Sequence, residues 1–326
     1  MRMFWRLLQT GTPAPLKDEV LLMADSRRRY PHETLASLTR ERLQFISNQS
    51  HIDVATALLY HHVHTTYAPF IQAVDAVKVD MEQLPHLPYK VWIAPAGFYE
   101  QFPMFGGDGG YITEIARRFG AEAATLPIPS GASVEEGAAI IREVLAHETP
   151  RSVLLVSLSK GGTDARMALL ESQGVADKVA VWLQICGLVQ GFHYGKLLIE
   201  GRFGWFWRRV GQAFLKVAKA RQRLFDELLT VGNDPLPRIP PHLQIVNVLG
   251  FPLTTHLRGT IRSRHRELSV WGPNDGYGLT RDAMLEPGVV YPVWGADHYF
   301  RFPGMTTLLY QLFTVLSTGI PLQSQP

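Results

Sequence analysis

The chain has 326 residues, of which 46% are hydrophobic and 19% charged, with a formal net charge of +3. This composition is typical of a globular protein with a large core, and the charge is too small to indicate a nucleic-acid partner. The single cysteine, Cys186, excludes an intramolecular disulfide and a cysteine-rich metal cluster. It lies in an apolar run, which favours a buried structural thiol.

The first residues show no long apolar core or cleavage site of a secretory signal, and no run of about 20 apolar residues follows anywhere. We therefore expect a cytoplasmic protein, of an oligomeric state that the sequence leaves open.

The sequence predicts a helical N-terminal extension over residues 1–88, because they lack the alternation of apolar and polar residues that is typical of strands. Asp53 is the expected N-cap of one helix. On that helix His61, His62 and His64 are closely spaced, but no acidic residue or cysteine at ligand spacing completes a metal site. Packing or surface roles are favoured for these histidines.

From residue 90 the pattern changes to short apolar runs that alternate with helical segments. Strands are expected at 90–97, 123–129, 151–159, 177–191, 243–253 and 288–295, and helices at 111–120, 133–147, 160–172 and 305–319. Alternation of this kind predicts an α/β fold, with a mostly parallel central sheet and helices on both faces. The expected core is 89–191 and 241–326, and the aromatic, basic segment 192–240 is the expected helical cap inserted into it.

One strand runs directly into a turn built from small residues. Ser159 follows the strand, with Ser157 two residues before it and Gly161 two residues after it. A nucleophile at a sharp strand-to-helix turn needs small neighbours there, because strand and helix backbones crowd together. The alternative is a serine-glycine turn that only connects strand and helix.

This segment resembles the nucleophile elbow of the α/β-hydrolase family, G-x-S-x-G, with serine in place of the first glycine. In order of elements the resemblance covers residues 90–326. It implies Ser159 as nucleophile, followed along the chain by an acid and then a histidine in loops after late strands.

His298 follows a late strand, and Asp275 lies 23 residues earlier in a Pro-Asn-Asp-Gly turn, which leaves room for one helix and one strand. Asp275 would orient the imidazole of His298, which takes the proton of Ser159. Asp275 would otherwise be a turn residue. The rival acids are Asp297, which as a neighbour of His298 points away from the ring in most loops, and Asp234.

The resemblance also implies an oxyanion hole. One donor is the N–H of Lys160, the residue after the nucleophile. The other is the N–H of Phe98, with Gly97 allowing close approach and Ala96 standing where many family members have histidine. The glycine-rich segment that follows lacks the lysine of a phosphate loop.

The expected cap carries Trp205 and Trp207 and is rich in basic residues over 202–229. Its aromatic side chains favour an apolar substrate pocket. Residues 202–229 form either an amphipathic lid that contacts a lipid surface or a cap helix with solvated charges.

These observations predict a hydrolase that cleaves small carboxylic esters with an apolar acyl or alcohol part through an acyl-enzyme. Neither a cofactor nor a metal is expected. A thioesterase or acyltransferase with the same triad, a non-catalytic binding protein of the same fold and a membrane-surface binding protein are the alternatives.

Overall fold

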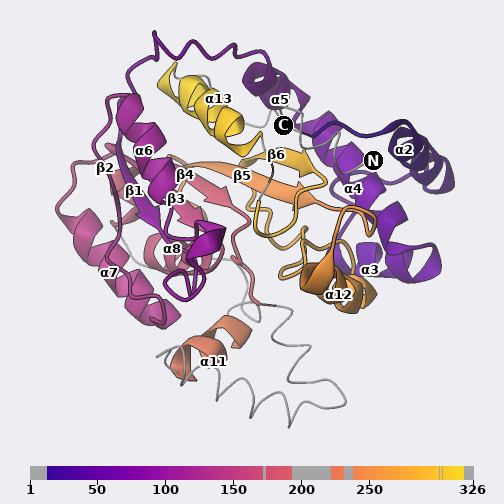
Figure 1. The fold of residues 1–326 in the computed structure, drawn as a ribbon. Helices are drawn as coiled ribbons and strands as arrows, with labels where there is room; N and C mark the ends of the chain where they lie inside the picture. Colours follow the sequence, from indigo (N-terminus) through magenta and orange to yellow (C-terminus); the bar gives the residue numbers. More distant parts are fainter. Residues whose placement is uncertain are drawn as a thin grey trace.

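The computed structural model describes residues 13–171, 174–192, 222–230, 238–300, 302 and 304–318. Six parallel strands form a sheet in the order β2-β1-β3-β4-β5-β6 (Figure 1). The strands are β1 (Lys90–Ala94), β2 (Ala123–Thr125), β3 (Val153–Leu158), β4 (Val179–Ile185), β5 (Gln244–Phe251) and β6 (Val289–Trp294). The predicted α/β class is confirmed, and all six strands lie within the ranges expected from the sequence.

Helices cover both faces of this sheet. The described α-helices are α2 (Lys17–Arg29), α3 (Arg40–Gln49), α4 (Ile52–Thr66), α5 (Ala68–Asp75), α6 (Gly110–Arg118), α7 (Val134–Ala146), α8 (Lys160–Leu170), α11 (Gln222–Thr230), α12 (Gly259–Leu268) and α13 (Met305–Ser317). The helices α4, α5, α6 and α13 pack on one face, and α7 and α8 pack on the other (Figure 1).

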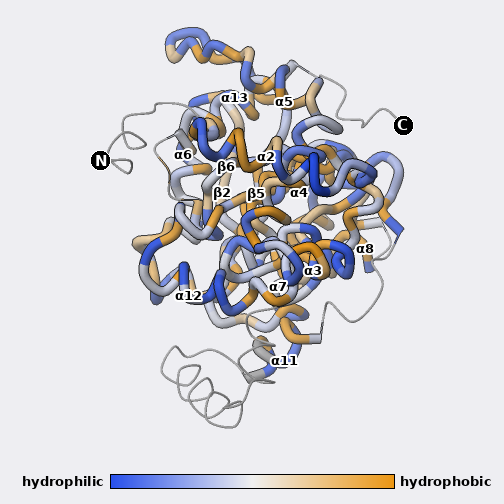
Figure 2. The backbone as a smooth tube through the Cα atoms, turned by 90° about the vertical axis from the view of Figure 1, so that its right-hand side faces the viewer, coloured by the Kyte–Doolittle hydropathy of each residue, from blue (hydrophilic) through white to orange (hydrophobic). Residues whose placement is uncertain are grey.

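Strand β3 shows why its apolar run is continuous. Leu154, Val156 and Leu158 belong to the core beneath α4, α5, α6 and α13, whereas Val153 and Leu155 belong to the core beneath α7 and α8. Successive side chains of a strand point to opposite faces, so a strand covered on both faces is apolar at every position. Figure 2 shows hydrophobic stretches gathered around β5 and β6, with hydrophilic stretches toward the outside.

The strand order places a topological switch point between β1 and β3. The chain passes from β1 through α6 to β2 on one side, and then through α7 to β3 on the other side of β1. The loops that leave the carboxyl ends of β1 and β3 therefore diverge around a crevice, which is where open α/β sheets bind ligands. Gly97 and Ser159 lie in these two loops.

The described N-terminal helices are integrated into the core. Helix α4 packs against β5 and β6, and its Leu58 and Leu59 are fully buried. The expectation that Asp53 caps this helix is wrong. His51 is the N-cap, and its Nδ1 accepts from the Asp53 N–H. The Asp53 carboxylate instead accepts from the N–H and hydroxyl of Thr254, a tertiary contact that local sequence does not reveal.

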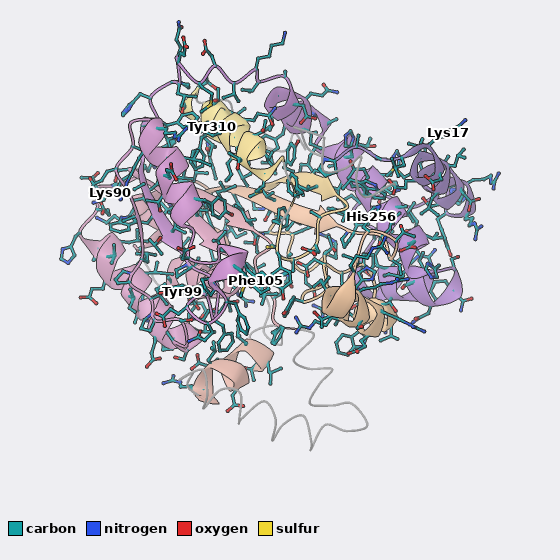
Figure 3. The ribbon with its side chains drawn as sticks, in the orientation of Figure 1. Lys17, Lys90, Tyr99, Phe105, His256 and Tyr310 are labelled. Atoms are coloured by element: carbon teal, nitrogen blue, oxygen red, sulfur yellow. The ribbon has the colours of Figure 1, made fainter. Side chains whose placement is uncertain are left out.

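Helix α2 is attached through a buried glutamate. One oxygen of Glu19 accepts from Nε2 of His256, and the other accepts from Nε1 of Trp294 at the end of β6. Figure 3 shows His256 beside the N-terminal helices. Within the described residues, none of the helices combines the length and apolar character needed to cross a membrane.

Candidate active site

The backbone turns sharply between β3 and α8. Ser159 has φ 50° and ψ −114°, a combination that non-glycine residues rarely adopt and that costs about 1–3 kcal/mol. Backbone bonds hold it there, since its N–H donates to Ile185 and its carbonyl accepts from Gly162 and Leu188. The result is a half-buried serine at the carboxyl edge of the sheet.

Gly161 is required by the same turn. A Cβ at this position would lie 2.3 Å from the carbonyl oxygen of Ala94 and 2.7 Å from that of Pro95. These are backbone atoms of β1 and its loop, which cannot move aside without disturbing the sheet. The expected close approach of strand and helix is therefore present at Gly161.

Ser159, His298 and Asp275 form a continuous hydrogen-bonded chain. The Oγ of Ser159 lies 2.8 Å from Nε2 of His298, and Nδ1 of His298 lies 2.7 Å from Oδ2 of Asp275. His298 and Asp275 are both buried, at 6% and 7% exposure. The structure thus brings together the three residues expected from the sequence, from the turn after β3, the segment between α12 and β6, and the loop after β6.

Asp275 is held by its own turn. Its Oδ1 accepts from the N–H groups of Tyr277 and Gly278, both at 2.9 Å, which leaves Oδ2 for the imidazole. The Asp275 carbonyl also accepts from the His298 N–H. Between the two residues the chain forms turns and β6, and the helix expected there is absent.

Asp297, the rival acid that the structure describes, is not bonded to the imidazole, whose two nitrogens are engaged by Ser159 and Asp275. Oδ1 of Asp297 accepts from the N–H of Tyr299 within its own loop. Asp234 lies outside the described residues.

The thiol of Cys186 is hydrogen-bonded to the loop that carries His298. Its Sγ donates to the carbonyl oxygen of His298 at 2.9 Å. Burial, followed by the nearby carboxylates of Asp275 and Asp297, raises the pKa of the Cys186 thiol well above its usual range. The group is therefore a neutral donor and not a thiolate nucleophile.

The backbone N–H groups of Lys160 and Phe98, the two expected oxyanion donors, have different surroundings. Lys160 is the first residue of α8, where a helix leaves backbone N–H groups without intrahelical acceptors. Phe98, in contrast, donates its N–H to the carbonyl of Ser130 at 2.9 Å, so this conformation contradicts its assignment as the second donor. The backbone of Phe98 is left-handed, at φ 60°, and the loop at Ser130 lies within its reach. Sequence does not show that neighbour.

Gly97 lies next to the residue after the serine. A Cβ on Gly97 would be 3.4 Å from Cβ of Lys160, an ordinary contact distance. In the described part of the chain, the Gly97 N–H donates to no backbone carbonyl.

Two aromatic rings lie beside His298 and two more stack on them, an arrangement that the sequence analysis did not predict. The ring of Tyr277 lies 4.7 Å from the imidazole, and its hydroxyl is hydrogen-bonded to that of Tyr299. Phe192 stacks on Tyr277, and Phe105 stacks on Tyr299. The guanidinium of Arg264 on α12 lies 4.5 Å from the Tyr277 ring centroid.

The cap is described only in part. Residues 193–221 and 231–237 lie outside the described structure, and with them Trp205, Trp207 and most of 202–229. The described helix α11 packs Leu224 and Leu228 against Val134 at the start of α7. Across the described residues, no group of three or more histidine, cysteine, aspartate or glutamate residues is arranged to hold a metal ion.

Comparison with solved structures identifies the fold. The chain superposes on a metagenomic carboxyl esterase with a TM-score of 0.55, at 16% identity, over 75% of this chain and 80% of that one. It superposes on the mature lipase of Bacillus licheniformis with a TM-score of 0.53, at 16% identity, over 72% and 96% of the two chains. The chain has the α/β-hydrolase fold.

A lipase of Staphylococcus hyicus has the same fold, with a TM-score of 0.53 at 12% identity, over 72% of this chain and 98% of that one. No family model matches the sequence, and neither does any curated protein. Within the α/β-hydrolase fold, the turn after β3, the segment between α12 and β6, and the loop after β6 carry the three hydrogen-bonded residues.

Proposed function

We propose that this protein is a serine hydrolase that cleaves carboxylic esters with an apolar acyl or alcohol part through an acyl-enzyme. The observation that supports this is the hydrogen-bonded chain from Ser159 through His298 to Asp275, with Ser159 on a strained turn. A serine aligned on an imidazole that is itself oriented by a carboxylate is activated for nucleophilic attack.

In the acylation step, Oγ of Ser159 attacks the ester carbonyl carbon while Nε2 of His298 takes the hydroxyl proton. The carboxylate of Asp275 holds Nδ1–H and stabilises the imidazolium that forms. The tetrahedral intermediate then collapses, and His298 gives its proton to the departing alcohol. Water next attacks the acyl-enzyme with His298 as base, and the acid is released as the serine is regenerated.

The developing oxyanion needs two N–H donors. The N–H of Lys160, at the start of α8, is one, supported by the partial positive charge of a helix N-terminus. We assign the second to Gly97, because the Phe98 N–H is engaged by Ser130 and Gly97 lies against Lys160. In this role Gly97 replaces Phe98.

An apolar substrate is supported by the aromatic rings around the imidazole. Tyr277 and Tyr299 lie beside His298, where the departing or entering group would lie. Phe192 and Phe105 extend this ring surface by stacking on the two tyrosines. Thioester hydrolysis and acyl transfer use the same groups and differ only in leaving group or acceptor. The cytoplasmic location and lipid contact through 202–229 stay predictions from the sequence.

A fluorophosphonate probe tests the nucleophile. We expect covalent labelling of the wild-type chain and its loss in Ser159→Ala, with labelling retained in Ser152→Ala, the same change at the residue just before β3. A folded wild-type chain that does not label would exclude the proposal in favour of a non-catalytic binding protein. Rates with p-nitrophenyl esters of increasing chain length, and with matched thioesters, would then define the substrate.

A further inference from the structure

The side chain that follows the proposed nucleophile is a buried lysine. Lys160 is 4% exposed, and its ammonium donates to the carbonyl of Ser133 at 3.1 Å and to Oδ2 of Asp164 at 2.7 Å. Its aliphatic stem lies against Gly97. One side chain thus contacts its own helix, the start of α7 and the loop after β1.

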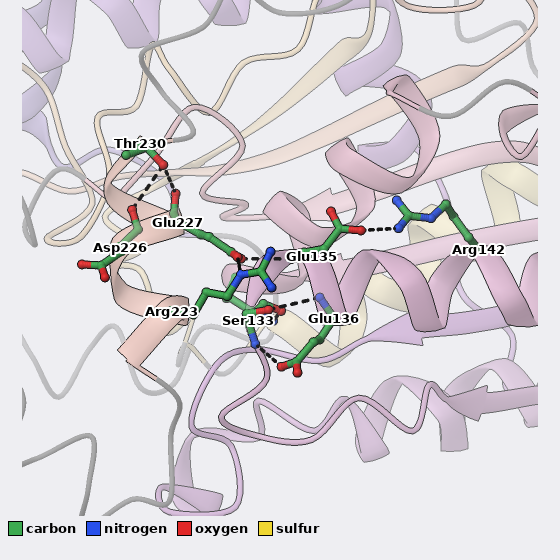
Figure 4. A network of polar contacts seen from close by, with 9 residues as sticks. Ser133, Glu135, Glu136, Arg142, Arg223, Asp226, Glu227 and Thr230 are labelled. Carbon is green, nitrogen blue, oxygen red and sulfur yellow. Dashed lines mark hydrogen bonds and ion pairs between the residues drawn. The ribbon is translucent and has the colours of Figure 1, made fainter.

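The contact at Ser133 is made with a rigid point of the fold. Ser133 is the N-cap of α7, and it exchanges hydrogen bonds with Glu136 in a capping box (Figure 4). The neighbouring N–H of Glu135 donates to Glu227 of α11. The start of α7 is therefore held from both sides, so an ammonium bonded to Ser133 has a fixed anchor.

The same loop also holds the segment after β1. Three residues before the N-cap, the Ser130 carbonyl accepts from the Phe98 N–H, and its hydroxyl accepts from the Glu100 N–H and donates to Gln101. The loop 130–133 is therefore bonded at one end to the segment that follows Gly97 and at the other end to Lys160.

Asp164, the counter-ion of Lys160, is buried at a cost in free energy. Asp164 is fully buried, its Oδ1 has no hydrogen-bond partner in the described structure, and a Cβ on Gly137 would overlap its carboxylate. Burial, together with a smaller contribution from the charge of Glu227, raises the pKa of Asp164 to about 7, although the Lys160 ammonium opposes this. A buried pair of this kind is weak support for stability, since apolar side chains of similar size do as well.

We propose that Lys160 is a positioning residue for the oxyanion hole. Its ammonium holds the loops at 130–133 and 97–98 at a set distance from the backbone N–H of the same lysine. The inference rests on the proposed function and deepens it. Oxyanion donors act only when they are held within about 0.5 Å of the productive geometry, so a tie between the two donor segments contributes to kcat. Substrate binding outside the hole does not depend on it.

The test uses Lys160→Met, the double variant Lys160→Met/Asp164→Asn, which removes both charges, and Asp164→Asn, which keeps the ammonium. We expect kcat for a p-nitrophenyl ester to fall by about 10- to 100-fold in both Met variants, with KM changed less than about threefold. In Asp164→Asn, kcat should fall less than in the two Met variants. Affinity for a trifluoromethyl ketone, which forms a tetrahedral adduct, should fall in parallel with kcat.

Lys90→Met is the matched control. Lys90 also forms ion pairs, with Glu122 and Glu148, but it begins β1 at the opposite edge of the sheet, and Figure 3 shows it apart from Tyr99 and Phe105. Its kcat should stay within about twofold of wild type. Thermal unfolding of each variant separates loss of fold from loss of positioning.

Wild-type kcat in a folded Met variant would overturn the inference and leave the proposed function intact. So would equal losses in Asp164→Asn and Lys160→Met, because the ammonium would then have no role of its own. An inactive wild-type chain would overturn both.

Discussion

The hydroxyl of Ser157 accepts a hydrogen bond of 2.8 Å from Nε1 of Trp182 on the neighbouring strand β4. Both side chains are fully buried. This contact accounts for serine at the position where the α/β-hydrolase elbow has glycine: it satisfies an indole N–H that has no access to water. The crowding that demands glycine occurs instead at Gly161.

We predict that Ser157→Gly lowers the free energy of unfolding by about 1–3 kcal/mol, because the Trp182 N–H would be left buried without an acceptor. Trp182→Phe in the Ser157→Gly background should recover part of this loss. Urea denaturation of the two single variants and the double variant measures the coupling. Additive losses would show that the hydrogen bond is not the cause. Ester hydrolysis should change little in Ser157→Gly, since the turn at Ser159 keeps its other bonds.

Asp275→Asn should lower kcat by about 10³- to 10⁴-fold, because an amide at this position favours the wrong tautomer of His298. The N–H groups of Tyr277 and Gly278 still have an oxygen acceptor in this variant, so the fold should persist. Steady-state kinetics with a p-nitrophenyl ester, alongside circular dichroism, tests this. Asp297→Asn is the matched control, and an equal loss there would reopen the choice of acid.

Gly161→Ala should destabilise the fold by about 3 kcal/mol or more, because the new methyl group would meet backbone oxygens of Ala94 and Pro95. Gly110→Ala provides the comparison, since the nearest atom there is a side-chain oxygen of the exposed Asp108, at 3.1 Å. Thermal unfolding measures both. Equal midpoints in the two variants would contradict the close approach of β1 and α8.

Glu19→Gln should destabilise the protein in a manner that depends on pH. Burial alone would raise the pKa of Glu19, but hydrogen bonds from His256, the Leu16 N–H and Trp294 outweigh it and lower the pKa from 4.5 to about 2. Because the pKa of Glu19 is lower in the native state than in the unfolded chain, its carboxylate stabilises the fold at pH values above the unfolded pKa of 4.5. This contribution is lost as the pH falls from 4.5 toward 2. At about 1.4 kcal/mol per unit, the contribution at neutral pH is roughly 3 kcal/mol.

Urea denaturation of wild type and Glu19→Gln between pH 7 and pH 3.5 provides the measurement. The difference in unfolding free energy should be largest at neutral pH and shrink below pH 4.5. Asp25→Asn, which removes a partly exposed carboxylate of the same helix, should cost less than about 1 kcal/mol at every pH. A difference for Glu19→Gln that does not vary with pH would rule out the charge as its source.

The order of strands and helices and the turn at Ser159 could be predicted from the sequence because their causes are local. A strand covered on both faces is apolar throughout, and the capping box at Ser133 and Glu136 needs only residues of one turn. The crowded turn requires small residues next to Ser159. Each of these requirements is met within a few positions of the chain, so each is visible without a structure.

The donors and supports of the candidate site depend on segments that are distant in the sequence. The Ser130 carbonyl accepts from the Phe98 N–H, 32 residues earlier in the chain. Asp275 and His298 meet across 23 residues, with β6 between them. The residue type at Lys160 does not reveal that its ammonium is buried against α7.

The sequence by itself thus determined the parallel α/β architecture and the position of the serine turn, through periodicity and local crowding. The tertiary structure decided which N–H groups are engaged, which carboxylate reaches His298 and which aromatic rings lie beside it. Hydrogen bonds between loops depend on distances across the folded chain, and spacing along the sequence does not encode those distances.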